Sequence, residues 1–118
     1  MTLPELYQRI DGSYDQALRV MRMDKLIDKY IRKYPDSGMA EAVLEAEDSS
    51  ALFEAAHAMK GVCANLGLTA LAEDASLLTE EFRPGGVRQL SDGEVQEILD
   101  RIEQQHQKAV DGIRLYQA

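Results

Sequence analysis

One helical stretch decides the fold of this chain, 53-FEAAHAMKGVCANLG-67. It is rich in alanine, and its apolar residues recur every three to four positions, which is the spacing of an amphipathic helix. Asp48-Ser49-Ser50 supplies three candidate N-caps shortly before it. Gly67 is a residue type that commonly terminates helices. The stretch therefore predicts a helix that ends at Gly67.

The same helical spacing continues along almost the whole chain, and no stretch longer than four residues alternates apolar and polar side chains as a strand would. Besides the helix just described, the pattern predicts helices over residues 3–10, about 14–34 with a kink near 23–24, about 38–47, 69–82 and 91–116. We therefore expect an all-α fold, an antiparallel up-down four-helix bundle with a short N-terminal helix and a short connecting helix. Residues 1–118 are expected to form this single domain.

Several residues mark where these helices begin and end. Pro35 ends the segment before it, because the residue preceding a proline is disfavoured in the helical region. Thr69 is the expected N-cap of the helix over 69–82, and Pro84-Gly85-Gly86 closes that helix. Ser91-Asp92-Gly93-Glu94 matches the capping box S-x-x-E. The apolar seam of the last helix is Val95, Leu99, Ile102, His106, Ala109, Ile113 and Tyr116.

The composition excludes several functional classes. The chain has 118 residues, of which 45% are hydrophobic and 29% charged, with a net charge of -8. That charge argues against nucleic acid and against anionic membrane surfaces as partners. No apolar run approaches 18 residues and the N-terminus is not basic and then apolar, so neither a membrane span nor a signal peptide is expected. The single cysteine, Cys63, cannot form an internal disulfide, which favours a cytoplasmic location.

The two histidines are expected in different environments. At about 100° per residue, the core line of the helix over 53–67 places His57 about 140° and Gly61 about 180° away from the core. That core line consists of Leu52, Ala56, Met59, Cys63 and Leu66. His106 instead falls on the apolar seam of the last helix, where a hydrogen-bonded structural role is expected. Cys63 is likewise expected to be a small buried apolar residue and not a nucleophile.

The exposed side of the helix over 53–67 carries an unusual set of residues. Lys60 lies one turn after His57, and Phe53, Gly61 and Ala64 surround the imidazole with small or apolar groups. A glycine in the middle of a helix costs about 1 kcal/mol relative to alanine. Core packing does not explain Gly61, because it points away from the core. The close approach of another molecule to the backbone would explain it.

An exposed histidine beside a lysine is suited to phosphoryl transfer. A free imidazole titrates at about pH 6.5, so at neutral pH it is largely unprotonated and nucleophilic. It can attack a phosphoryl group and hold it as a phosphoramidate. Phosphoryl transfer depends mainly on positioning and on charge stabilisation, which a lysine one turn away can supply.

The run Ala56-His57-Ala58-Met59-Lys60-Gly61, followed by Asn65-Leu66-Gly67, resembles the signature of the histidine phosphotransfer (HPt) domain. That signature is commonly A-H-x-L-K-G with a later L-G. The resemblance extends over nearly the whole chain, including 66-LGLTALAEDASLLTEEF-82. Met59 stands where the family more often has leucine, a change that conserves volume.

This resemblance implies a four-helix bundle that carries phosphate between receiver domains in a bacterial phosphorelay. His57 would be the phosphorylated residue, Lys60 would steady the phosphoryl group, and Gly61 would let the receiver approach. The expected partners are response-regulator receiver domains and a hybrid sensor kinase, and the chain itself is expected to be a monomer. The chain shows no glycine-rich nucleotide loop, so we expect a phosphoryl carrier without autokinase activity.

The resemblance also assigns the remaining parts of the reaction. No cofactor is expected in this chain, because the catalytic aspartate and Mg²⁺ would belong to the receiver. Receiver active sites are acidic in this family, so overall charge attraction cannot drive docking. We therefore expect Phe53, Gly61 and Ala64 to carry it, with Lys60 as a local positive charge.

Two other functions remain open at this stage. The first is an HPt-like adaptor that binds a receiver without carrying phosphate. The second is a dinuclear metal site built from two E-x-x-H motifs, Glu54 with His57 and Glu103 with His106. A dinuclear site requires all of its ligands to point into the bundle, whereas Glu54 and His57 are expected to point outward.

Overall fold

The computed structural model describes all 118 residues and contains only helices. The α-helices are α1 (Leu3–Arg9), α2 (Tyr14–Met21), α3 (Asp24–Lys33), α4 (Met39–Leu44), α5 (Ser49–Asn65), α6 (Thr69–Glu81) and α7 (Asp92–Gln117), and Tyr34–Asp36 forms a 3-10 helix, η1. The prediction of an all-α fold is confirmed. No helix combines the length and the apolar character that crossing a bilayer requires.

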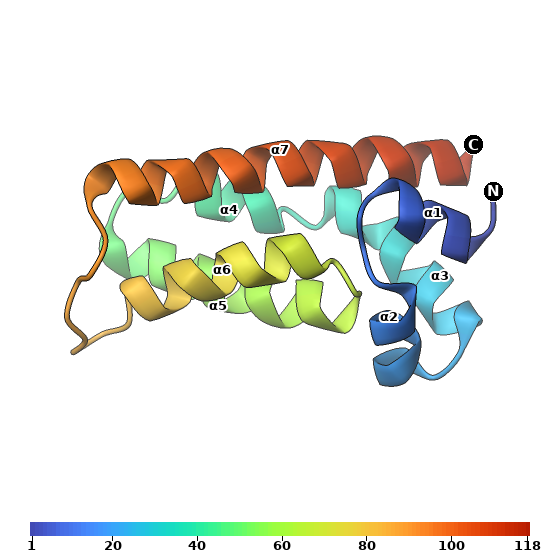
Figure 1. Cartoon of the computed structure of the whole chain (residues 1–118), viewed down its shortest axis with the longest axis horizontal. Helices are drawn as coiled ribbons and strands as arrows, with labels where there is room; N and C mark the ends of the chain where they lie inside the picture. The colour runs from blue at the N-terminus through green and yellow to red at the C-terminus, as the bar shows by residue number, and fades with distance from the viewer.

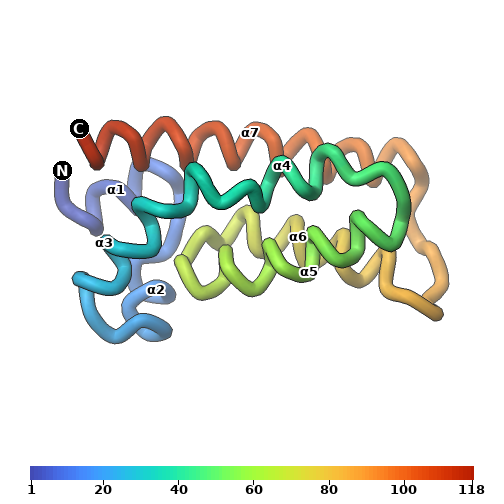
Figure 2. Tube along the Cα trace, turned by 180° about the vertical axis from the view of Figure 1, so that it is seen from behind, coloured from blue at the N-terminus to red at the C-terminus, as the bar shows by residue number.

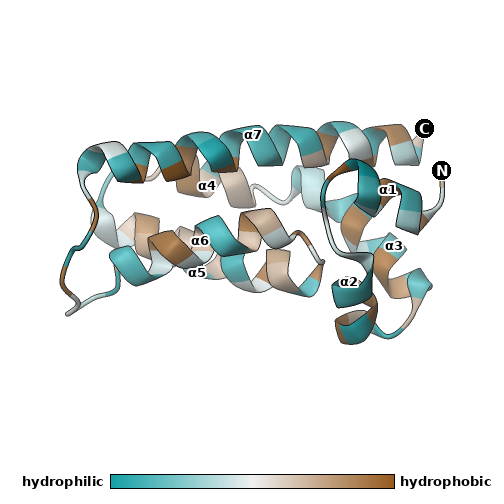
Figure 3. Ribbon diagram, viewed as in Figure 1, coloured by the Kyte–Doolittle hydropathy of each residue, from teal (hydrophilic) through white to brown (hydrophobic).

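The helices α4, α5, α6 and α7 form the bundle. α7 runs along the whole length of the molecule, and α5 and α6 lie antiparallel to each other below it (Figure 1). α6 packs against α7, while α4 packs against both α5 and α7 and so closes the bundle on the far side (Figure 2). The outward side of α7 is largely hydrophilic, as expected for a helix with one face in a core (Figure 3).

The segment from 14 to 34 is two helices and not the single kinked helix that the sequence pattern predicts. α2 ends at Met21, Arg22 adopts a left-handed backbone conformation with φ of 70°, and α3 begins at Asp24. A left-handed residue ends a helix and turns the chain, and α3 packs against α2, so the segment folds back on itself and does not merely kink. α3, η1 and α4 each contact α7, in the order in which they follow along the chain.

The turn between α5 and α6 is closed by backbone hydrogen bonds. Gly67 has a φ of 71°, and the amide of Leu68 donates to the carbonyl of Cys63 at 2.9 Å. This is the arrangement in which a glycine terminates a helix, as predicted. The prediction that Thr69 caps α6 is wrong, because Leu68 is the N-cap residue and makes no side-chain cap hydrogen bond. The predicted capping box between Ser91 and Glu94 is confirmed.

The N-terminal segment is attached to the end of α5. The Tyr7 hydroxyl donates to the carbonyl of Leu66 at 2.5 Å, and the amide of Ser13 donates to the carbonyl of Gly67 at 2.8 Å. Any side chain at Gly67 would clash, because a Cβ there would lie 2.2 Å from the Ser13 carbonyl oxygen. These contacts place α2 and α3 beside the C-terminal end of α5.

His106 and Cys63 both have the structural roles that the sequence predicts. The His106 ring is mostly buried, with Nδ1 2.8 Å from the Tyr34 hydroxyl and Nε2 3.1 Å from the Glu41 carboxylate. Every polar atom of the ring therefore has a partner. Cys63 is fully buried, and burial raises the pKa of its thiol to about 12, which leaves it unreactive.

Candidate functional site

The candidate site lies on the outward face of α5. Ala56, Met59 and Cys63 are completely buried and define the side of the helix that faces the core. His57 and Gly61 lie on the opposite side and are exposed. Their outward direction agrees with the direction predicted from the helical period.

Phe53 stacks on the imidazole of His57. The two ring centroids are 5.8 Å apart, and the ring planes differ by 6°. Phe53 is half-buried, so part of its ring contacts the rest of the protein and part of it is open to solvent. Stacking restricts the orientation of the exposed imidazole. Part of the entropy cost of orienting His57 for a reaction is therefore met before any partner binds.

Two cations lie close to this pair of rings. Lys60 is half-buried on the side of α5 that faces α6, one turn after His57. Arg83 follows the end of α6, and its guanidinium lies 5.7 Å from the centroid of the Phe53 ring. The positive charge near His57 therefore comes from two helices that are antiparallel in the bundle.

The carboxylate of Glu80 is paired with Arg83 and lies in the field of Lys60, with which it forms no ion pair. Arg83 donates to it at 2.7 Å. This hydrogen bond, more than the nearby charges of Arg83 and Lys60, lowers the pKa of Glu80. Glu80 is exposed, so the pair is flexible and screened by solvent. Both cations can therefore turn toward a more highly charged anion.

The sequence analysis did not identify Arg83. A usable signal was present, because α5 and α6 form an antiparallel pair around the turn at Leu68, and Phe53 and Arg83 each lie 15 residues from that turn. Residues equally distant from a tight turn lie opposite each other in such a pair. The helical wheel of a single helix does not contain this information.

The surface around His57 has low relief. A Cβ added at Gly61 would meet no atom within 4 Å, so the packing of this chain does not require a glycine there. Ala58 is exposed and Ala64 is half-buried, and neither side chain extends beyond a methyl group. Another protein can therefore bring its backbone close to α5 beside the imidazole.

The two E-x-x-H motifs do not come together. Glu54 and His57 are exposed on the outward face of α5, whereas His106 binds Tyr34 and Glu41 within the bundle. No group of three or more His, Cys, Asp or Glu side chains has the proximity that a metal site needs. The chemistry that this surface supports is instead nucleophilic attack by an accessible imidazole, with two cations nearby to neutralise an anion.

Comparison with known proteins identifies one match. The family model described as the Hpt domain matches residues 36–111, which contain α4, α5, α6 and most of α7. The match therefore includes the residues around His57 and leaves α1, α2 and α3 outside. Neither the curated proteins nor the solved structures contain a match to the chain.

Proposed function

Because the chain belongs to the histidine phosphotransfer (HPt) family, we propose that His57 accepts a phosphoryl group from a receiver-domain aspartate and passes it to a second receiver. Members of this family act in histidine phosphotransfer in phosphorelays, and they interact with receiver domains. The observation that carries the assignment is the exposed His57 ring, stacked on Phe53 in the middle of a face of α5 with small side chains.

The proposed reaction is a direct displacement at phosphorus. The lone pair of the unprotonated ring nitrogen of His57 attacks the phosphoryl group of the receiver's aspartyl phosphate. The P–N bond forms as the P–O bond breaks, and the aspartate leaves as a carboxylate. The reverse displacement, with the carboxylate of a second receiver as the nucleophile, regenerates His57. Neither step requires ATP, so the chain acts as a carrier and not as a kinase.

Lys60 and Arg83 neutralise the phosphoryl oxygens in this proposal. A phosphoryl group on His57 carries more negative charge than the Glu80 carboxylate, so it competes for both cations. Lys60 is in no ion pair, and releasing Arg83 from Glu80 costs little, because an exposed ion pair contributes less than about 1 kcal/mol. The chain supplies no cofactor to the reaction, and Mg²⁺ is expected in the receiver's own acidic site.

Docking of the receiver would use the small and apolar groups around His57. The contacts come from the ring of Phe53, the bare backbone at Gly61 and the methyl group of Ala64. An apolar contact region avoids the repulsion between a chain of net charge -8 and an acidic receiver. The missing side chain at Gly61 provides the clearance that the receiver's backbone needs.

The test is phosphotransfer from a radiolabelled, phosphorylated receiver, run with the wild type, His57→Gln and His106→Gln. His106→Gln is the matched control, because the chain contains two histidines in all. We expect acid-labile and base-stable label on the wild type and on the control, and none on His57→Gln. Label on His57→Gln would refute the assignment. A wild type that binds receivers but takes no label from any of a broad panel would instead indicate a binding-only adaptor.

A further inference from the structure

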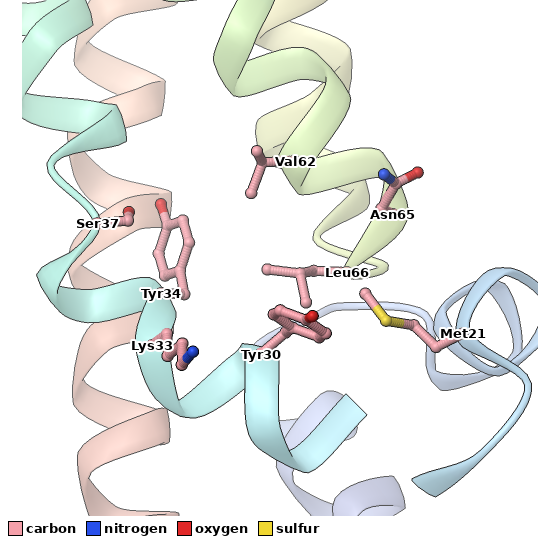
Figure 4. Close-up of a pocket in the computed structure, with 8 residues that line it drawn as sticks. All are labelled: Met21, Tyr30, Lys33, Tyr34, Ser37, Val62, Asn65 and Leu66. Atoms are coloured by element: carbon pink, nitrogen blue, oxygen red, sulfur yellow. The ribbon is translucent and has the colours of Figure 1, made fainter. Parts of the chain in front are cut away.

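An apolar groove lies beside the C-terminal end of α5. It has a volume of about 310 Å³ and lies between α5, α3 and the end of α2. Figure 4 shows the side chains that line it, which are Met21, Tyr30, Lys33, Tyr34, Ser37, Val62, Asn65 and Leu66. Tyr30 is 42% exposed, although the helical pattern places it on the apolar face of its segment. The break at Arg22 creates this groove, because it lets α2 fold back beside α3.

The helix α3, which supplies Tyr30 and Lys33 to the groove, carries unpaired positive charge beside it. Lys25, Lys29 and Lys33 follow one another at four-residue intervals, so they form one row along the helix, and all three are exposed. None of them takes part in an ion pair, whereas Arg32 on the same helix is bound to Asp28. The ammonium groups of Lys29 and Lys33 lie 5.5 Å and 5.7 Å from the centroid of the Tyr30 ring. This row is a local positive surface on a chain of net charge -8.

The groove is continuous with the surface around His57. His57, Gly61 and Asn65 are spaced by four residues, so they form one exposed row along α5, and Asn65 lines the groove. At a rise of about 1.5 Å per residue, Asn65 lies only about 12 Å from His57 along the helix axis. A typical interface buries about 800 Å² per partner, which corresponds to a disc of radius about 16 Å. A protein centred on His57 therefore covers the near edge of the groove.

We infer that this groove and its lysine row are the second half of the receiver-docking surface. The occupant is an acidic segment of the receiver that inserts an apolar side chain between Tyr30 and Val62 and places its carboxylates against Lys29 and Lys33. This inference rests on the proposed function, and it adds the part of the surface that selects the partner. The apolar groups around His57 hold any receiver close, whereas the lysine row favours receivers with a complementary acidic segment.

The charge distribution favours a protein as the occupant over nucleic acid or a membrane. The positive surface is one row on a ten-residue helix, and the rest of the chain carries the excess of acidic residues. A polyanion extending beyond this row would meet those acids and be repelled. A folded partner with one acidic segment meets only the row itself.

The experiment compares phosphotransfer kinetics from the receiver that transfers fastest to the wild type in a panel. The test variants are Lys29→Glu/Lys33→Glu, which reverses the charge, and Tyr30→Ala, which removes one wall of the groove. The control is Arg9→Glu/Arg114→Glu, because both arginines are exposed and unpaired, do not line the groove and give the same change in net charge. Phosphoramidate, a small phosphodonor, reports the reactivity of His57 without docking.

We expect both groove variants to raise the receiver KM by about tenfold while kcat stays unchanged, because they weaken docking and leave the reacting groups in place. High salt should reduce the effect of the charge reversal, and labelling by phosphoramidate should match the wild type. The control should stay within about twofold of the wild type. A wild-type KM in either groove variant, with label on His57, overturns the docking inference alone. If His57 takes label from no receiver, the proposed function fails and this inference fails with it.

Discussion

Replacing Gly61 with alanine should make the protein more stable and a poorer phosphoryl acceptor. Gly61 lies in the middle of α5, and a Cβ there would have open space on all sides. Alanine removes the conformational freedom that glycine has in the unfolded chain, so Gly61→Ala should raise the free energy of unfolding by about 1 kcal/mol. With an unfolding entropy of about 2.1 cal/mol/K per residue, this corresponds to an increase in Tm of about 4 °C.

The expected loss of function follows from the same methyl group. If the receiver's backbone packs against Gly61, the added methyl overfills that contact and costs about 1–3 kcal/mol in the complex. The receiver KM should then rise by roughly 5- to 150-fold, since each 1.4 kcal/mol is about a factor of ten. Labelling of His57 by phosphoramidate should not change, because no protein has to dock.

Two other glycines provide matched controls. Gly93 lies in the first turn of α7, where an added Cβ makes only an ordinary contact at 3.9 Å with the Ser91 hydroxyl. Gly93→Ala should therefore be tolerated without affecting phosphotransfer. Gly112 faces α1, and a Cβ there would lie 2.4 Å from Cγ2 of Ile10. Gly112→Ala should consequently destabilise the protein by about 1–3 kcal/mol.

Thermal unfolding followed by circular dichroism and receiver titrations measure the two effects separately. A Gly61→Ala protein that is more stable and transfers with the wild-type KM would refute the idea that the receiver needs the bare backbone. A destabilised Gly61→Ala protein would refute the structural basis, because it would mean that the space beside Gly61 is filled.

Three further outcomes are expected. Tyr34→Phe should lower the free energy of unfolding by about 1–2 kcal/mol in urea titrations, because it removes a partner from the mostly buried ring of His106; an unchanged midpoint would contradict this. Gly67→Ala should lower the free energy of unfolding by more than about 2 kcal/mol, because an alanine is strained in the left-handed conformation and its Cβ would clash with Ser13. Native-like stability of this variant would show that the turn can rearrange. Finally, the buried carboxyl of Glu81 has its pKa held below its ordinary value of 4.5, chiefly by a hydrogen bond from the Arg88 side chain and further by hydrogen bonds from the backbone amides of Gln89 and Leu90. A carboxyl group whose pKa is lowered by folding stabilises the folded state when the pH is above the ordinary pKa of that group. This contribution disappears as the pH falls through the folded-state pKa. Glu81→Gln should accordingly be less stable than the wild type at pH 7, and the difference should shrink progressively below pH 4.5; a difference independent of pH would refute the linkage.

The amino-acid pattern alone predicts the direction in which the side chains of a helix point. His57 and Gly61 point outward and Cys63 points inward because the helical period fixes these angles once the core line is known. The same reasoning assigned His106 to a hydrogen-bonded position inside the bundle, and the capping box placed the start of α7. These predictions succeed because periodicity and capping depend only on residues a few positions apart.

The contacts between helices that are distant in the sequence depend on tertiary packing and cannot be predicted from a single helix. The sequence pattern predicts a kink near residues 23–24, but not the left-handed conformation at Arg22, because arginine is not a residue type that favours it. The attachment of the N-terminal segment to the end of α5 depends on hydrogen bonds between residues far apart in the sequence. The position of Arg83 beside Phe53 and the groove between α3 and α5 depend in the same way on packing between distant segments. The exposure of His57 can therefore be predicted from one helix, whereas the surface that surrounds it forms only when several helices pack together.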